Sequence, residues 1–253
     1  MIRVSRATVT YNDCKTTLLT HTTAMSCPSF SLPAVYSCPG ASKHPDSPCA
    51  HCYACQGMYL LDSTARAQWI RYRWTRDCMR SALGREEWIE TLAREISATG
   101  CGYFRWHDSG DLFSGAYVTM VAEVCRLTIH IRHWLPTQSF RIAGIDSAIR
   151  KHLLPLENVI VRPSTSKLDA FPPRLRSVGY AAGATVYTSS AKNHRSVRLC
   201  PKSTLGGSCA SNNCRLCWDI PKSAVGFLVH GIGGKGRKTR VTDRVRGRPK
   251  PAR

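Results

Sequence analysis

The segment YFRWHDSGDLFSGAYVTMVAEVCRL, residues 103–127, contains a strand pattern, a polar turn and a helix pattern in immediate succession. Residues 103–107 have the length and the aromatic content of a short strand. Residues 114–127 repeat apolar side chains at helical spacing, and Ser114 is placed to cap that helix. A strand that leads through a turn into a helix is the unit from which parallel sheets are built.

The same alternation continues on both sides of this segment. Helix patterns occupy residues 62–82, 85–100 and 144–154, and strand patterns occupy residues 132–138, 158–164, 184–190 and 224–230. We therefore predict an α/β fold with a mainly parallel sheet and crossover helices, as a complete or partial (β/α) barrel. We expect one domain over residues 1–230 and a separate tail over residues 231–253.

Polar residues at the end of the first strand form a candidate site. His107 is a candidate proton donor or acceptor, and Asp108 and Asp111 are candidates for binding a substrate amine, a hydroxyl or a metal. The carboxyl ends of strands are where α/β folds bind ligands. Alternatively, residues 107–111 form an Asx or glycine turn followed by a helix cap.

Two later strands end in polar residues in the same way, which predicts a common rim. These residues are His133 and Thr137 in the motif HWLPT that ends one strand, and Arg162, Ser164 and Thr165 in the motif VRPSTS that ends the other.

Eight of the thirteen cysteines fall into two short segments. The first cysteine segment, residues 38–55, contains Cys38, Cys49, Cys52 and Cys55, and the second cysteine segment, residues 200–217, contains Cys200, Cys209, Cys214 and Cys217. Short spacings such as CxxC hold zinc or iron–sulfur clusters, and the spacing alone does not choose between them. The remaining five, Cys14, Cys27, Cys78, Cys101 and Cys125, lack such spacing and are interpreted as ordinary buried cysteines.

The compartment supports metal ligands over disulfides. The first residues lack the apolar core of a signal peptide, and no stretch approaches the length of a membrane span. We expect a soluble cytoplasmic protein, with no membrane partner, whose thiols stay reduced.

The charge favours a polyanionic partner, and nucleic acid is the first candidate. The chain carries 36 Lys and Arg against 16 Asp and Glu, which gives +20. Residues 231–253 contribute nine Lys or Arg and one Asp, hence +8, and are expected to be disordered. Arg246, Gly247, Arg248 and Pro249 resemble an AT-hook, which lies in the narrow minor groove of A·T-rich DNA. The alternative is a tail that only aids solubility.

Several motifs, in order, resemble the gene product eighty-eight family of phage proteins. They are CPG at residues 38–40, CAHCYA at 49–54, GMY at 57–59, RWHDSGD at 105–111, HWLPT at 133–137 and the closing CP…C…CRLCW at 200–218. The resemblance covers roughly residues 38–218 and implies a phage or prophage protein in a bacterial host. Cys38, Cys49 and Cys52 match the family pattern, whereas Cys55 is an additional cysteine. The resemblance therefore leaves open whether the first site uses three or four cysteine ligands.

The resemblance also implies features similar to radical SAM enzymes. In those enzymes a [4Fe–4S] cluster held by three thiolates leaves one iron free to bind S-adenosylmethionine. Tyr53 is similar to the aromatic residue beside the last cluster cysteine, and Ser109, Gly110 and Asp111 are similar to the motif that meets the amine of S-adenosylmethionine. The usual CxxxCxxC spacing is absent.

We therefore predict an iron–sulfur, radical SAM-like enzyme that acts on nucleic acid or a nucleotide and is held near DNA by its tail. It would carry one or two [4Fe–4S] clusters. A second hypothesis is a non-enzymatic, zinc-stabilised DNA-binding protein. A third is a metal-dependent nuclease that uses His107, Asp108 and Asp111.

Overall fold

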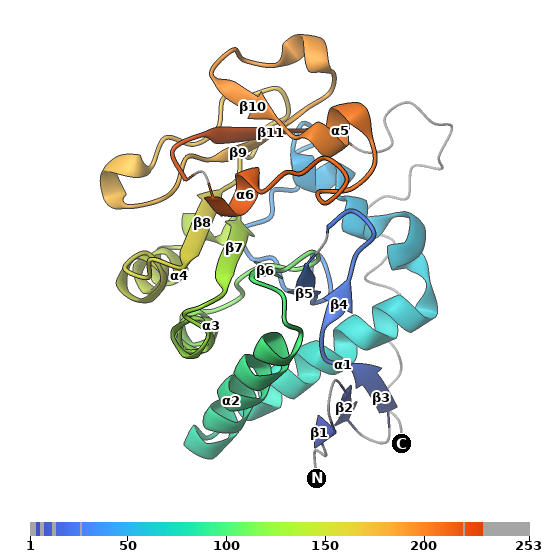
Figure 1. Cartoon of the computed structure of the whole chain (residues 1–253), viewed down its shortest axis with the longest axis vertical. Helices are drawn as coiled ribbons and strands as arrows, with labels where there is room; N and C mark the ends of the chain where they lie inside the picture. Colours follow the sequence, from blue (N-terminus) through green and yellow to red (C-terminus); the bar gives the residue numbers. More distant parts are fainter. Residues whose placement is uncertain (1–3, 6–7, 12–13, 26, 220, 230–253) are drawn as a thin grey trace.

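The computed structural model describes residues 4–5, 8–11, 14–25, 27–219 and 221–229. The predicted tail over residues 231–253, with Arg246, Gly247, Arg248 and Pro249, lies outside the described residues. Strands of the described part form three sheets (Figure 1). The first is antiparallel and consists of β1 (Val4–Ser5), β2 (Thr8–Tyr11) and β3 (Cys14–Thr17).

The second sheet has five strands and carries the candidate site. Its strands, in spatial order, are β4 (Thr20–His21), β5 (Pro28–Phe30), β6 (Tyr103–Trp106), β7 (Arg132–Thr137) and β8 (Val159–Pro163). Strands β5 to β8 are parallel, and β4 pairs with β5 in the antiparallel direction. The residue range predicted as the first strand of the alternating pattern is therefore confirmed as β6.

The third sheet is parallel and has the order β10–β11–β9. Its strands are β9 (Ala184–Tyr187), β10 (Val197–Leu199) and β11 (Ala224–Leu228). One isolated parallel bridge, between Ser164 and Ala184, joins the end of β8 to the start of β9. The structure thus confirms a mixed α/β fold with parallel sheets, in which the parallel strands are divided between two sheets and the five-stranded sheet ends at β4 and β8.

Helices connect the parallel strands. They are α1 (Asp62–Cys78), α2 (Ala82–Ala98), α3 (Gly115–Leu127), α4 (Ala143–Ala148), α5 (Pro201–Leu205) and α6 (Leu216–Asp219), with a π-helical turn at Ile149–Leu153 after α4. Ser114 caps α3 as predicted, because its Oγ accepts a 3.2 Å hydrogen bond from the Tyr117 amide. Gly100, at a φ of 65°, follows the end of α2 in the left-handed conformation that glycine tolerates. Figure 1 shows α1, α2 and α3 below the five-stranded sheet and the β10–β11–β9 sheet above it.

The two faces of β6 belong to two different hydrophobic clusters. Successive side chains of a strand point to opposite faces. Phe104 and Trp106 are fully buried in the larger cluster, which includes Trp74 of α1 and Trp88 of α2. Tyr103 faces the smaller cluster, which contains Cys27, Trp134, Leu216, Cys217, Trp218 and Val225. The sheet therefore separates a large apolar core from a smaller, cysteine-containing one.

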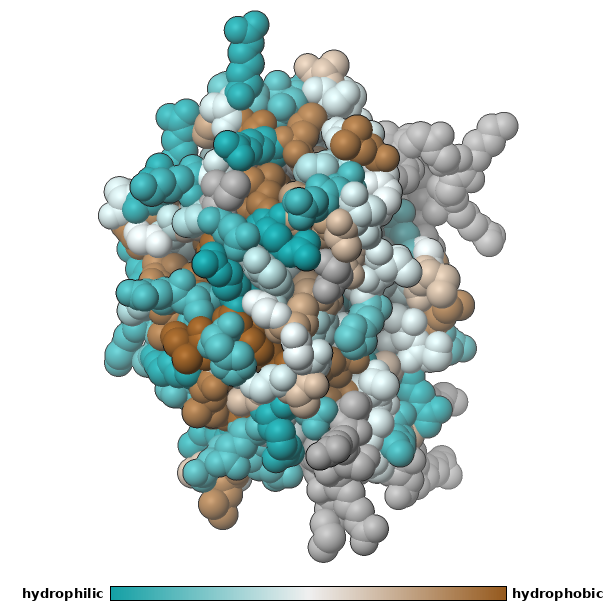
Figure 2. Space-filling view, viewed as in Figure 1, coloured by the Kyte–Doolittle hydropathy of each residue, from teal (hydrophilic) through white to brown (hydrophobic). Residues whose placement is uncertain are grey.

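The surface offers no membrane-spanning element in the part of the chain described. No helix there combines the length and the apolar composition needed to cross a bilayer. On the face shown in Figure 2, hydrophilic residues divide the apolar ones into small areas.

Candidate metal centres and the polar strand end

The first cysteine segment folds as short 3₁₀ turns. They span Pro48–His51, Tyr53–Cys55 and Gly57–Leu60. Ser47 begins the first turn, since its Oγ accepts a 3.1 Å hydrogen bond from the Cys49 amide. Because a 3₁₀ helix has three residues per turn, the spacing of Cys49, Cys52 and Cys55 favours thiols on one side of the segment.

The thiols of this segment influence one another. Burial raises the pKa of Cys38, and the neighbouring Asp111, Cys49 and Cys55 raise it further. A hydrogen bond with Cys55, followed by burial, raises the pKa of Cys52. The four thiols therefore lie near enough to interact electrostatically, and Cys38 and Cys49 also interact with Asp111. Metal ions bind thiolates, so binding here would release protons.

Asp108 joins the first cysteine segment to the end of β6. Its side chain is 1% exposed, and its Oδ2 accepts a 2.9 Å hydrogen bond from the Tyr59 hydroxyl. Its Oδ1 accepts a 2.7 Å bond from Ser29 Oγ of β5, and its carbonyl accepts a bond from the Tyr53 hydroxyl. Hydrogen bonds to a buried carboxyl group are costly to leave unmade. The tyrosines that follow Cys52 and Cys55 therefore fix this segment over the strand end.

Two arginines provide positive charge near Asp108. Burial alone would lower the pKa of Arg105, but Tyr53 and Asp108 raise it, and its Nη2 donates a 2.8 Å bond to the Tyr53 hydroxyl. Burial lowers the pKa of Arg71 to about 10, and Asp108 opposes that shift. Arg71 of α1 also donates 3.0 Å bonds to Thr17 O and Ser31 Oγ. Asp108 thus lies in a buried polar group rather than in an exposed turn.

His107 has an unusual backbone and a partly unsatisfied ring. Its φ is 59°, in the left-handed region that is uncommon for residues other than glycine. The ring is 3% exposed, and Nε2 lies 2.9 Å from the Tyr117 hydroxyl. Nδ1 has no hydrogen-bond partner among the described residues. Burial, and then Arg105, lowers the pKa of His107 to about 3. The imidazole is therefore neutral at neutral pH, and its Nδ1 is a buried polar atom without a hydrogen bond in this part of the structure.

Ser109, Gly110 and Asp111 hold neighbouring chain segments together. Ser109 Oγ donates a 2.8 Å bond to the Leu32 carbonyl. Gly110 has a φ of 89°, and a Cβ there would lie 2.6 Å from Ser37 Oγ. Asp111 Oδ1 accepts a 2.7 Å bond from Thr137 Oγ1, and its Oδ2 accepts a 2.8 Å bond from the Gln138 amide. These contacts join the ends of β6 and β7.

The predicted rim is only partly brought together. Thr137 meets Asp111, and Gln138 Nε2 donates a 2.8 Å bond to the Thr165 carbonyl and lies 3.5 Å from Cys49 Sγ. Gly40 of the CPG motif packs against the same turn, because a Cβ there would lie 2.3 Å from the Gln138 carbonyl. Because glycine has no side chain, the CPG turn can pack its backbone closely against the end of β7.

His133 and Arg162 are not rim residues, contrary to the sequence-based prediction. His133 is fully buried beside Trp106, and the Trp106 Nε1 donates a 3.2 Å hydrogen bond to the His133 Nδ1. Arg162 is fully buried on the other face of the sheet and donates to the carbonyls of Ala182, Leu216 and Ser223. Both residues precede the ends of their strands, where side chains still point into the packed layers.

The second cysteine segment lies over the smaller hydrophobic cluster. Cys200 follows β10, and its amide donates a 2.8 Å bond to the Gly226 carbonyl of β11. Cys217 is buried on α6, and Cys200 and Cys214 pack against the same cluster. Burial raises the pKa of Cys209, and the neighbouring Cys200 and Cys214 raise it further. The cysteines of the second segment, although separated in the sequence, therefore lie in the same region next to the smaller hydrophobic cluster.

No ready-made metal site or disulfide exists in the described residues. All thirteen cysteines lie within them, and none forms a disulfide. No three of the described His, Cys, Asp and Glu side chains form a group that could hold a metal ion as they are placed. The donor set itself, four thiols in each segment, suits zinc and iron–sulfur centres.

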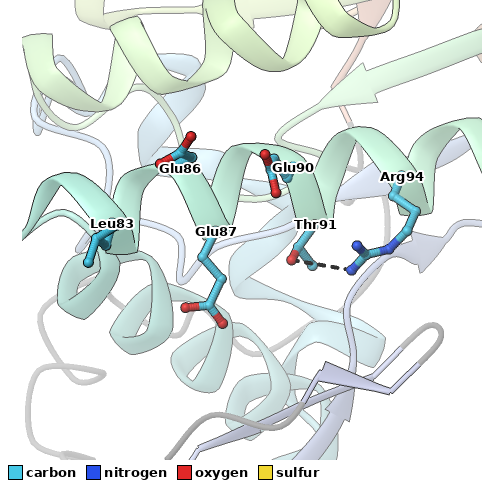
Figure 3. A pocket seen from close by; sticks show the side chains of 6 residues that line it. All are labelled: Leu83, Glu86, Glu87, Glu90, Thr91 and Arg94. Atoms are coloured by element: carbon cyan, nitrogen blue, oxygen red, sulfur yellow. Dashed lines mark hydrogen bonds between the residues drawn. The ribbon is translucent and has the colours of Figure 1, made fainter.

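A separate groove lies on α2 and contains none of the predicted residues. It has a volume of about 410 Å³ and is lined by Leu83, Glu86, Glu87, Glu90, Thr91 and Arg94 (Figure 3). Three glutamates against one arginine make this groove unsuitable for a polyanion.

The family model described as Gene product 88 matches residues 5–220, which is most of the chain. The chain belongs to the Gene product 88 family. The match includes both cysteine segments and the whole five-stranded sheet, so the phage family indicated by the motifs is confirmed. No curated protein and no solved structure matches the chain.

The structure adds residues that the motifs of this Gene product 88 family member did not single out. Tyr59 lies in the GMY motif and Arg105 in the RWHDSGD motif, but their roles depend on contacts with Asp108 and Tyr53 across the fold. Ser29 and Arg71 lie in segments without any motif. The only sequence signal that could have indicated these two residues is a hydroxyl or guanidinium group next to an apolar run.

The two buried histidines predict a pH-dependent stability. Burial lowers the pKa of His107 and of His133 to about 3 in the folded chain, whereas an unperturbed histidine titrates near about 6.5. As the pH falls, the unfolded chain binds these protons first. The free energy of unfolding should therefore decrease below pH ~6.5, by about 1.4 kcal/mol per pH unit for each histidine, until the folded-state pKa is reached.

Urea unfolding between about pH 7 and about pH 4 measures this slope. Asparagine is tolerated in the left-handed conformation, so a His107→Asn variant keeps the backbone of this turn. In this variant the free energy of unfolding should depend less steeply on pH, because only His133 of the two histidines still contributes. NMR signals of protonated rings for His107 and His133 in the folded protein near pH 6 would contradict the prediction.

Proposed function

We propose that this chain is an iron–sulfur enzyme with radical SAM-like chemistry that acts on nucleic acid or a nucleotide. The observation that supports this proposal most is the position of the first cysteine segment. Cys38 and Cys49 interact with Asp111, and the two tyrosines of this region donate hydrogen bonds to Asp108, so the first cysteine segment meets the polar carboxyl end of β6. The carboxyl ends of parallel strands are the usual place for ligands and catalysis.

Cys38, Cys49 and Cys52 would hold the cluster, and the surroundings of Cys55 support three ligands. Cys55 is buried, whereas the other three thiols are partly exposed. When bound, a [4Fe–4S] cluster held by three protein thiolates would supply one iron that is open to S-adenosylmethionine. Cys55 would then act next to the cluster through its hydrogen bond with Cys52.

The surrounding residues would bind and orient the polar groups of the cofactor or substrate. Tyr53 is 37% exposed and connects Asp108 with Arg105. The unpartnered Nδ1 of the neutral His107 ring can accept or donate one hydrogen bond. Asp111 would position the site rather than contact the cofactor, since protein groups already bind both of its oxygens.

That engagement of Asp111 also argues against the nuclease hypothesis. A nuclease metal ion would need His107, Asp108 and Asp111 as ligands together, through a ring nitrogen of the histidine and carboxylate oxygens of the aspartates. Asp108 and Asp111 instead accept bonds from Tyr59, Ser29 and Thr137.

DNA would be bound through the tail and not through α1. Arg246, Gly247, Arg248 and Pro249 supply the AT-hook-like contacts, and the tail carries +8 of the total +20. Along α1, Arg71 is buried and Arg76 donates a 3.0 Å bond to the Tyr72 hydroxyl, so α1 is not a simple basic face.

Anaerobic purification should yield a brown protein with iron and sulfide. After reduction by dithionite, which supplies one electron for each cleavage, it should cleave S-adenosylmethionine to methionine and 5′-deoxyadenosine, whose added hydrogen atom comes from the substrate or, without substrate, from buffer or protein. Serine replacement of Cys38, Cys49 and Cys52 should abolish this cleavage, whereas the Cys125→Ser variant, whose thiol is buried in the larger cluster, should retain it. A colourless protein with about two zinc ions per chain, as two four-thiolate sites would bind, would contradict the enzyme and support the zinc-stabilised DNA-binding alternative.

Deletion of residues 231–253 should weaken DNA binding and reduce its salt dependence. Each lost phosphate contact lowers the slope of log affinity against log salt by about 0.9. Fluorescence anisotropy with A·T-rich and G·C-rich duplexes measures both effects. The paired Arg246→Ala and Arg248→Ala substitutions should remove the A·T preference, and Lys250→Ala should leave it intact. Unchanged affinity after deletion would eliminate the tail as a DNA tether.

A further inference from the structure

Cys27 and Cys101, which stand alone in the sequence, lie at the starts of two neighbouring parallel strands. Cys27 immediately precedes β5, and Cys101 precedes β6 by two residues. The register pairs Ser29 with Arg105, so Cys27 lies opposite position 103, two residues from Cys101. Adjacent strands are about 4.8 Å apart, so residues separated by 74 positions in the chain become neighbours in space.

The second cysteine segment reaches the same place. The Cys209 amide donates a 3.0 Å hydrogen bond to the Ala24 carbonyl, three residues before Cys27. Cys27 and Cys217 belong to the smaller hydrophobic cluster, and Cys101, Cys200 and Cys214 pack against it. Cys101 and Cys209 also lie near enough to Cys27 for the three thiols to interact electrostatically. Six cysteines from three segments thus gather on one face of the sheet.

Cationic side chains surround this group. Arg105 and Arg215 lie near enough to Cys27 and Cys209 to interact electrostatically with both thiols. Arg162, which is fully buried, interacts in the same way with Cys217. Arg105 also lies over the Trp134 ring, with its guanidinium carbon 4.7 Å from the ring centroid. Positive charge near several thiols stabilises thiolates, and so a centre with a net negative charge.

We propose that Cys27 and Cys101 are ligands of a second metal centre, together with Cys200, Cys209, Cys214 and Cys217. Six thiolates exceed the four that one tetrahedral zinc ion or one [4Fe–4S] cluster takes, so the centre is larger than a single zinc ion or a single [4Fe–4S] cluster. Its metal is thiophilic, either zinc or iron with sulfide. Binding requires the thiol side chains to turn toward common points, because no three of the described side chains form a metal group as placed. The inference goes beyond the proposed function, and it requires only that the second cysteine segment binds metal, as its spacing predicts.

The test uses the full chain with the four cysteines of the first segment replaced by serine. Only the second centre then contributes to the zinc, iron and sulfide measured per chain. Cys27→Ser and Cys101→Ser, each added to this protein, should lower the bound metal at least two-fold and change the visible absorption of the iron-loaded or cobalt-substituted form. Matched controls are Cys78→Ser for the buried Cys27 and Cys14→Ser for the partly exposed Cys101. They should change neither quantity.

A second measurement needs no substitution and therefore does not depend on variant folding. In the metal-loaded wild-type chain, Cys27 and Cys101 should resist alkylation and become at least ten-fold more reactive after chelation, as read by mass spectrometry. Cys78 and Cys125 should not change. Unchanged metal content in both variants, equal alkylation before and after chelation, or a second segment that binds no metal would each overturn the proposal.

The outcomes separate this proposal from the proposed function. Loss of metal in the Cys27 and Cys101 variants, in a wild-type protein that does not cleave S-adenosylmethionine, would support the second centre and reject the enzyme. Cleavage by the wild-type protein, with metal content unchanged in both variants, would support the enzyme and reject the six-thiolate centre.

Discussion

The hydrogen bonds of Asp108 and Asp111 are the constraint on which the rest of the candidate site depends. Tyr53 and Tyr59 attach the first cysteine segment to Asp108, and Asp111 holds the turn after β7 against the end of β6. Buried carboxyl groups need such partners, and hydrogen bonds to a charged group contribute about 1.5–3 kcal/mol each. The two aspartates thus position the cysteines as well as forming part of the polar strand end.

Strand β6 connects the two cysteine segments. The first segment lies at its carboxyl end through Asp108, and the second lies on the face where Tyr103 packs. Arg105 contacts both regions, because it donates to the Tyr53 hydroxyl and also lowers the pKa of Cys27, Cys209 and Cys217. One guanidinium group therefore couples the electrostatics of both thiol groups.

Local periodicity predicted the parts of the fold that local sequence determines. Strand β6, helix α3 and the Ser114 cap were predicted because apolar spacing and a capping hydroxyl are local signals. Strand β5 was missed, since its three residues, Pro-Ser-Phe, carry no alternation. The grouping of Cys27 with Cys101 depends on strand register, which spacing in the chain does not show. The sequence-based prediction placed His133 and Arg162 at the rim because a strand pattern does not show which of its residues lie inside the strand and which lie at its carboxyl end.

A double-mutant cycle between Tyr59→Phe and Asp108→Asn tests the central claim most directly. If the tyrosine attaches the cysteine segment to the strand end, the two substitutions should be coupled by about 1–3 kcal/mol in the free energy of unfolding. Tyr36→Phe, an exposed tyrosine in the same part of the chain, should show no coupling with Asp108→Asn. Additive effects of Tyr59→Phe and Asp108→Asn would show that the first cysteine segment is not held by this interaction and would contradict the account.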